Sequence, residues 1–186
     1  MGRDDAIRSA AAELFHLRGF SAVGVDEIGA RAGVSGPAIY RHFSGKDEIL
    51  AELFEQGMDD IVRVTGRRFD DPHEELLHMA REHARHVLSD LQLAGVWTRE
   101  HRSLVEPHRG RYQRRARSYL ERWRTCIARC YPEAPEPWVT IAAHATLGTL
   151  NSLPAWPPAA TRANELPRQV AAHVVSALRW LEADAG

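Results

Sequence analysis

A short run of hydrogen-bonding side chains near the N-terminus is the first feature of this sequence that suggests a chemistry. Tyr40, Arg41 and His42 carry a phenol, a guanidinium fork and an imidazole, all of which donate hydrogen bonds to phosphates or base edges. Lys46, the only lysine in the chain, follows at the expected start of a helix, where its charge and the free N–H groups both suit a phosphate. We predict that DNA phosphates are contacted by Tyr40, His42 and Lys46, and bases by Arg41 and by the small residues Gly36, Pro37 and Ala38.

Two short helices joined by a tight turn, over residues 25–33 and 36–42, must position these side chains. Gly33 stands where the first helix has to end, since a glycine adopts positive φ without a Cβ clash. Ser35 is the expected N-cap of the second helix, and its hydroxyl can cap only the Ala38 N–H, because Pro37 at the N2 position has no N–H to donate. The pattern predicts a helix-turn-helix whose second helix suits a DNA major groove.

The N-terminal quarter of the chain resembles the DNA-binding domain of TetR-family transcriptional regulators. The resemblance covers about residues 7–54 and rests on LF followed by RGF, then VDEI, AGVS, IYRHF and GKD. It implies a three-helix DNA-binding head followed by a helical domain that binds an effector and dimerises. Gly24 departs from the pattern, because the family usually has Thr or Ser there, as a helix cap that also touches a phosphate. A glycine caps passably, but it has no hydroxyl to offer a phosphate.

Composition is that of an ordinary globular protein. Of 186 residues, 44% are apolar and 26% are charged, which is enough for a core and typical of a soluble chain. No apolar run has the length of a membrane span, and the N-terminus shows no signal-peptide pattern. Cys126 and Cys130 are too few for a disulfide framework, and their place on an apolar stripe favours packing over redox sensing. These features predict a cytoplasmic protein with no membrane association.

Net charge does not by itself indicate a nucleic-acid-binding protein. The whole chain carries −1 at pH 7. Residues 1–50 contain six Lys or Arg against seven Asp or Glu. The prediction of DNA binding therefore depends on where the charges are placed and not on their sum.

Helical periodicity extends over the whole chain. Apolar residues recur at the i, i+3, i+4 spacing of core-facing helices, and glycines and prolines separate the segments. The expected helices cover residues 3–19, 25–33, 36–42, 44–65, 72–89, 91–104, 108–131, 138–150 and 168–182. The sequence thus predicts an all-α protein of about nine helices, with a helix-turn-helix DNA-binding domain in residues 1–46 and a ligand-binding and dimerisation domain in residues 47–186.

The middle helices carry apolar and aromatic side chains suited to lining a cavity. Pockets for small ligands are mostly apolar, with a few polar groups that fix orientation. Glu100, His101 or a nearby arginine is expected to hold the polar end of such a ligand. The predicted effector pocket is lined by Phe54, Met58, Trp97, Glu100, His101, Tyr119 and Trp123.

Two polar groupings on these helices have alternative interpretations. Eight arginines line the helix expected over residues 108–131, either as a solvated face or as a docking patch for an anionic ligand tail. His83 and His86 lie three residues apart, but their spacing matches no zinc signature. We therefore interpret them as solvated or core-edge histidines, and we predict no metal and no cofactor.

The last two expected helices are low in charge. Residues 138–150 are rich in small side chains, which let another helix approach closely. The resemblance implies that the chain dimerises through this pair, and packing within the chain is the alternative. The predicted interface consists of Trp138, Ile141, Ala145, Gly148, Val174, Leu178 and Leu181.

These features predict a ligand-controlled transcriptional repressor that binds a near-palindromic operator in double-stranded DNA as a homodimer. The segments VWTREHRSL and GTLNSLPAW resemble TetR-type regulators associated with fatty-acid or other acyl-CoA metabolism, which suggests an acyl-CoA or a related lipid metabolite as the small-molecule effector. Control by a protein partner without an effector is the alternative. An enzyme is not expected, because no nucleophile elbow, phosphate loop, Cys/His pair or carboxylate dyad is visible, so no catalytic residue is predicted.

Overall fold

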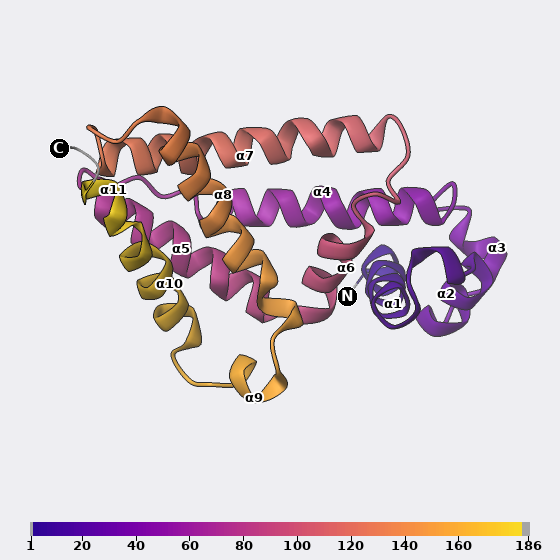
Figure 1. Ribbon diagram of the computed structural model, residues 1–186. Helices are drawn as coiled ribbons and strands as arrows, with labels where there is room; N and C mark the ends of the chain where they lie inside the picture. The colour runs from indigo at the N-terminus through magenta and orange to yellow at the C-terminus, as the bar shows by residue number, and fades with distance from the viewer. Residues whose placement is uncertain (1, 184–186) are drawn as a thin grey trace. The chain divides into compact units, whose positions relative to one another are not determined.

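The computed structural model describes residues 2–183 (Figure 1). These residues form α-helices and short 3-10 turns, which confirms the all-α prediction. Within them, no helix has both the length and the apolar character needed to cross a membrane. The elements are α1 (Arg3–Arg18), η1 (Phe20–Ala22), α2 (Val25–Ala32), α3 (Gly36–Ile39), α4 (Lys46–Val64), α5 (Pro72–Ser89), α6 (Leu91–Glu100), α7 (His108–Cys130), α8 (Glu136–Ser152), η2 (Leu153–Ala155), α9 (Pro158–Thr161), α10 (Leu166–Ser176), η3 (Ala177–Arg179) and α11 (Trp180–Ala183).

The chain divides into two compact units. The first unit runs through Met58 and also takes in Gln92–Gln113. The second unit contains Asp59–Leu91 and the chain from Arg114 onwards. The unit boundaries therefore fall within α4, α6 and α7. The predicted boundary at residue 46, between a DNA-binding domain and a ligand-binding and dimerisation domain, concerns function and stays a prediction.

The first unit is built around a continuous apolar cluster. Ile7 and Phe15 from α1, Ile28 from α2 and Ile39 from α3 are fully buried in it. The first half of α4 contributes Ile49, Leu50, Leu53 and Phe54, and Val96 and Leu104 complete the cluster. The short α3 has only one turn, so its stability comes from this tertiary packing and not from helix propensity.

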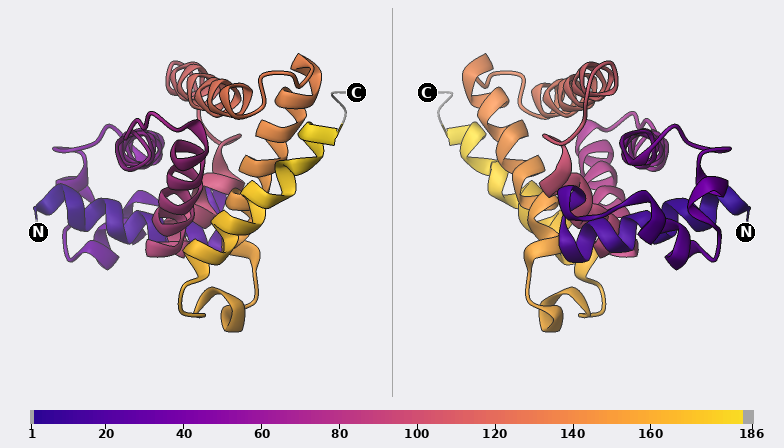
Figure 2. Two further views of the ribbon diagram at one scale, coloured as in Figure 1. Left: turned by 90° about the vertical axis from the view of Figure 1, so that its left-hand side faces the viewer. Right: turned by 90° about the vertical axis from the view of Figure 1, so that its right-hand side faces the viewer.

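The second unit is a helical layer centred on α5. This helix packs against α10, α8 and η2, and α8 also contacts α10 (Figures 1 and 2). Leu76 and Met79 of α5 and Trp123 and Ile127 of α7 are fully buried. The segment that carries α9 projects away from α8 and α10 in every view of Figure 2.

Several local expectations need correction. The helix predicted over residues 36–42 ends at Ile39, and Tyr40, Arg41 and His42 lie in a tighter turn with i→i−3 hydrogen bonds. Ser35 makes no side-chain cap, and the Ala38 N–H instead donates to the Ser35 carbonyl oxygen at 2.9 Å. The final helix predicted over residues 168–182 is interrupted by η3, and the short helix α9 lies between the predicted helices, where no helix was predicted.

Candidate nucleic-acid interface

The turn between α2 and α3 is the structural basis of the candidate interface. Gly33 ends α2 with a φ of 71°, as predicted, which is a left-handed conformation that suits glycine. Gly29, which the sequence reasoning missed, permits the close approach of the two helices. A Cβ there would lie 2.9 Å from the Val34 carbonyl oxygen and 3.2 Å from the Gly36 nitrogen. These two glycines set the angle at which α3 leaves α2.

The candidate reading surface is partly exposed. Tyr40 is 59% exposed, and Arg41 and Pro37 are exposed beside it. The Arg41 side chain has no ion-pair or hydrogen-bond partner within residues 2–183, so its guanidinium is available to an external acceptor. Ala38 is buried and packs with the core, so its side chain does not belong to the exposed face.

The His42 side chain contacts a carboxylate of the same unit. Its Nδ1 lies 2.6 Å from a carboxylate oxygen of Asp4, near the start of α1. A phosphate contact by His42 would have to compete with this carboxylate. The contact predicted for His42 therefore stays a prediction, with a local competitor that the sequence did not reveal.

Lys46 opens α4, as expected, but its ammonium points into the head. Nζ donates to the carbonyl oxygens of Phe20 and Val23 at 3.0 Å each, and to that of Ser21 at 3.4 Å. The same ammonium lies 4.5 Å from the centroid of the Phe20 ring. The phosphate contact predicted for Lys46 would require the ammonium to leave these acceptors.

The acidic residues of the first unit are largely paired with its arginines. Arg31 contacts Glu13, Arg18 contacts Glu27, and Arg8 bridges Asp5 and Glu52. This pairing explains how a unit without a basic net charge can still present a cation locally. Arg41 is one of three exposed arginines of this unit, with Arg3 and Arg102, whose side chains have no ion-pair or hydrogen-bond partner among residues 2–183.

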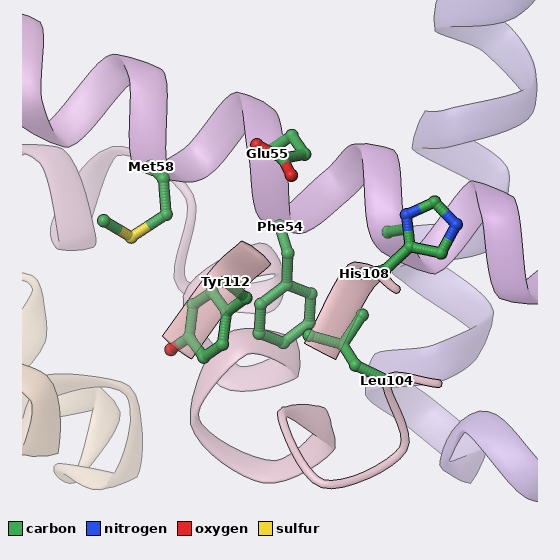
Figure 3. Close-up of a pocket in the computed structure, with 7 residues that line it drawn as sticks. Phe54, Glu55, Met58, Leu104, His108 and Tyr112 are labelled. Atoms are coloured by element: carbon green, nitrogen blue, oxygen red, sulfur yellow. The ribbon is translucent and has the colours of Figure 1, made fainter. Parts of the chain in front are cut away.

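Two of the predicted pocket residues line a crevice in the first unit. Phe54 and Met58 of α4 lie there with Tyr112 of α7 and with Leu104 (Figure 3). The Phe54 and Tyr112 rings meet edge to face, with 4.9 Å between centroids. Side chains fill the crevice so closely that it has no room for a water molecule. It is therefore packed core in this conformation.

The three predicted pocket residues on and after α6 have other contacts. The Trp97 indole N–H donates to the Leu53 carbonyl oxygen at 3.1 Å. Glu100 accepts the Phe20 N–H, also at 3.1 Å, and His101 is exposed. None of the three lines the crevice described above.

Tyr119 and Trp123 lie in the second unit, in a buried aromatic cluster with His83. The His83 Nδ1 is 3.0 Å from the Tyr119 hydroxyl, and its Nε2 is 3.1 Å from the Asn151 side-chain oxygen. Burial lowers the pKa of His83 to about 4 and raises the pKa of Tyr119 to about 12, so both side chains are neutral at pH 7.

His83 is thus a core residue, not a solvated or core-edge one. The signal was present in the sequence, because His83 continues the apolar stripe of Leu76, Met79, Ala80 and Val87 at helical spacing. Among residues 2–183, no three His, Cys, Asp or Glu side chains gather closely enough to hold a metal ion.

The arginine-rich side of α7 is mostly neutralised. Arg111 pairs with Glu55, Arg115 with Asp59, and Arg129 with the buried Glu75. The other paired arginines are Arg109 with Glu106, Arg122 with the Thr65 carbonyl, and Arg124 with Glu121 and Glu136. Arg114 and Arg117 have no such partner among the described residues. Any docking of a phosphate on this helix therefore has two free cations to use.

A groove of about 430 Å³ lies between α7 and α8 in the second unit. Arg117 and Arg124 line it, but so do Glu121 and Glu136. The two carboxylates repel anions and already hold Arg124. The groove itself is therefore a poor site for a phosphate.

The predicted interface residues divide into two sets. Trp138 and Ile141 are 42% and 49% exposed, and Ala145 and Gly148 continue the same exposed side of α8. Val174, Leu178 and Leu181 are buried within the chain, where they have almost no surface left to offer a partner. Trp180 of α11, which the sequence reasoning did not single out, is 37% exposed and adjoins Trp138.

The first unit is all-α and contains a helix-turn-helix, with the exposed Arg41 just after the second helix. These features are typical of the class of helix-turn-helix DNA-binding proteins. Residues 7–53 match the family described as "Bacterial regulatory proteins, tetR family", and residues 70–179 match "Tetracyclin repressor-like, C-terminal domain". The chain belongs to the TetR family of transcriptional regulators. It is therefore a ligand-responsive transcriptional regulator of a DNA-binding, non-enzymatic family, as predicted.

Known proteins are similar to the chain to different extents. Over 53 residues it is 47% identical to the HTH-type transcriptional activator FasR of Mycolicibacterium smegmatis, a match that covers 28% of this chain and only 24% of that protein. A regulatory protein of the tetR family from Rhodococcus RHA1 has a TM-score of 0.85 at 22% identity, over 97% of each chain. AibR, solved with isovaleryl coenzyme A and operator DNA, has a TM-score of 0.81 at 20% identity, over 95% of this chain and 97% of that one. The two structures show that the fold is shared.

Proposed function

We propose that the chain is a cytoplasmic repressor that binds a near-palindromic operator as a homodimer and is released by a small apolar effector. The exposed and unpaired Arg41 beside Tyr40, at the end of the helix-turn-helix, carries the DNA-binding part of this proposal. Arg41 is the residue proposed to read a base, with Tyr40 on a neighbouring phosphate. The proposed functional division is a DNA-binding domain in residues 1–46 and an effector and dimerisation domain in residues 47–186.

Dimerisation is proposed through the exposed side of α8 together with α11. Trp138, Ile141 and Trp180 give this surface three large apolar side chains in contact with solvent. Exposed apolar surfaces of this kind mark association sites. A two-fold dimer presents two recognition segments to successive major grooves, and this symmetry is what makes the operator a near-palindrome.

The effector is proposed to bind in the second unit, next to Tyr119 and Trp123. The aromatic rings supply an apolar wall, and the Tyr119 hydroxyl and His83 supply neutral hydrogen-bonding groups. An acyl-CoA is the proposed ligand class. The isovaleryl coenzyme A bound to AibR supports this choice, as do the free Arg114 and Arg117 as partners for phosphates.

The test has two stages. Genomic DNA fragments bound by the wild-type protein are selected and sequenced, and the enriched site is then used in a titration with acyl-CoAs, the matching free fatty acids and unrelated apolar compounds. Release by acyl-CoA but not by free acid supports the proposed ligand class. Release by no compound favours control by a protein partner instead, and a reporter gene behind the selected site distinguishes repression from activation.

A further inference from the structure

The 3-10 turn η1, which joins α1 to α2, is held from outside by two charged side chains. On one side, the Phe20 N–H donates to the Oε1 atom of Glu100 at 3.1 Å. The second carboxylate oxygen of Glu100 accepts the Ser103 hydroxyl at 2.8 Å. The end of α6 is fixed in its turn by Arg99, which donates to the His16 carbonyl oxygen at 3.1 Å. Glu100 is thereby presented to the turn in one orientation.

On the other side, Lys46 holds the carbonyl end of the same turn. Its ammonium has three N–H donors, and three backbone carbonyls of the turn lie within reach of them, those of Phe20, Ser21 and Val23. Such hydrogen bonds from a charged group are stronger than neutral ones. The Phe20 backbone is therefore held at both of its polar groups: its N–H donates to Glu100, and its C=O accepts from Lys46.

This turn leads directly into the first helix of the helix-turn-helix. Gly24 is the N-cap of α2 and supplies no side-chain cap. The start of α2 therefore has no cap of its own to fix its direction, and the preceding turn has to do so. A shift of this turn would carry α2 and the recognition segment with it.

We propose that Glu100 and Lys46 are positioning residues that clamp the turn from Phe20 to Val23 and so hold the helix-turn-helix in its DNA-binding orientation. This inference rests on the proposed DNA-binding function. It reassigns both residues, because Glu100 is then no effector ligand and Lys46 is no phosphate contact. Neither side chain needs to touch DNA for its loss to weaken binding.

A pure charge effect and the clamp predict opposite changes in DNA affinity when Glu100 is removed. Removing a carboxylate from the DNA-binding unit strengthens binding to a polyanion if charge alone matters. If the clamp matters, Glu100→Ala frees the turn, lowers the fraction of protein in the competent state and weakens binding about fivefold to tenfold. Glu100→Gln keeps an oxygen that accepts the Phe20 N–H, so it should bind DNA at least as tightly as the wild type.

Lys46 is tested by the salt dependence of binding. A lost phosphate contact reduces the slope of log K against log salt by about one unit. The clamp predicts that Lys46→Met weakens binding while the slope stays that of the wild type. A slope that falls by about one unit would overturn the assignment of Lys46.

The decisive readout needs no DNA. Hydrogen exchange of backbone amides is measured by NMR on the free wild-type protein and on Glu100→Ala, Glu100→Gln, Lys46→Met and Arg41→Ala. The clamp predicts faster exchange at the Phe20 and Val23 amides in Glu100→Ala and Lys46→Met, and wild-type exchange in Glu100→Gln. Arg41→Ala is the matched control, which should lose DNA affinity without any change at these amides.

The outcomes separate the clamp from the proposed function. If Glu100→Ala keeps the Phe20 amide protected and binds DNA as tightly as the wild type, the clamp is wrong. If the wild type selects no DNA site but the exchange pattern appears as predicted, the clamp stands and the DNA-binding proposal fails. Should Glu100→Ala not fold, Ser103→Ala is the milder variant, since it removes only the support of the second carboxylate oxygen and should speed exchange at Phe20 to a smaller extent.

Discussion

The indole rings of Trp138 in α8 and Trp180 in α11 meet edge to face, with 5.7 Å between centroids and planes at 90°. Both rings remain partly exposed, and Ile141 lies one turn along α8 from Trp138. The pair holds α11 against α8 and at the same time leaves an apolar surface open to solvent. Such a surface on a regulator of this family is where we place the second subunit.

Gly148→Arg should convert the dimer to a monomer. Gly148 is exposed in α8, and a Cβ added there meets no atom within 4 Å, so the single chain accommodates the arginine. Replacing glycine in a helix also favours the helical state by about 1 kcal/mol, which guards against unfolding as the cause. Sedimentation velocity measures the change in mass.

Ala128→Arg is the matched control for this prediction. Ala128 is an exposed position on α7, away from the proposed interface residues in sequence. It should remain a dimer with the same circular dichroism spectrum. A Gly148→Arg variant that sediments as a folded dimer would place the interface elsewhere.

Acid should destabilise the protein through His83. The pKa of His83 is about 4 in the folded chain against 6.5 for the free side chain. Below about pH 6.5 the unfolded chain therefore binds a proton at this histidine, whereas the folded chain does not. The contribution is fully present above pH 6.5, is lost as the pH falls towards 4, and reaches about 3 kcal/mol for the 2.5-unit difference.

His83→Gln should therefore be less stable at pH 7.5 but lose less stability between pH 7.5 and pH 4.5 than the wild type. Urea unfolding at the two pH values measures both effects. Burial also lowers the pKa of His78 and His86, so a smaller dependence of the same sign should remain in the variant. A pH dependence identical to that of the wild type would show that His83 is not the buried neutral residue described above.

Gly24→Ser should strengthen both the fold and DNA binding. The backbone at Gly24 has φ −99° and ψ 158°, which any residue adopts, and a Cβ there meets nothing within 4 Å. A serine hydroxyl can cap α2, worth roughly a few tenths of a kcal/mol over glycine, and by resemblance to the family can also reach a phosphate. Binding should tighten on all DNA sequences alike. Gly24→Ala lacks the hydroxyl, and equal affinity of the two variants would exclude the phosphate contact.

The acyl-CoA proposal predicts a selective effect at the two free arginines of α7. Replacing Arg114 and Arg117 together by Ala should raise the acyl-CoA concentration needed to release DNA about tenfold or more, since each loses a charge-assisted hydrogen bond to a phosphate. Arg109→Ala is the control, because Arg109 is already paired with Glu106. An unchanged release curve for the double variant would remove the phosphate role of α7.

Local features of the fold were readable from the sequence because they depend on short-range physics. The turn at Gly33 follows from the need for positive φ between two apolar segments, and the structure has it. The start of α5 at Pro72 follows from proline in a first turn, with Asp71 as its cap. The length predicted for α3 was wrong, because a one-turn helix takes its bounds from the packing around it.

Contacts between distant residues were not readable in this way. Glu100 lies 80 residues from its partner Phe20, and helical spacing says only which residues share a face. The same limit applies to Val174, Leu178 and Leu181, whose apolar stripe fits a neighbouring helix in the chain as well as one in a partner. The structure shows that the chain itself buries them.

The most direct test of the central proposal is the selection of genomic DNA fragments by the wild-type dimer at physiological salt. We predict enrichment of one near-palindromic motif, with half-sites centred about 10 base pairs or a multiple of that apart, and a changed preference at one position of each half-site for Arg41→Ala. Enrichment of no motif over random fragments, with binding that shows only the salt-sensitive affinity of a non-specific polyanion binder, would contradict the proposal that this chain reads an operator.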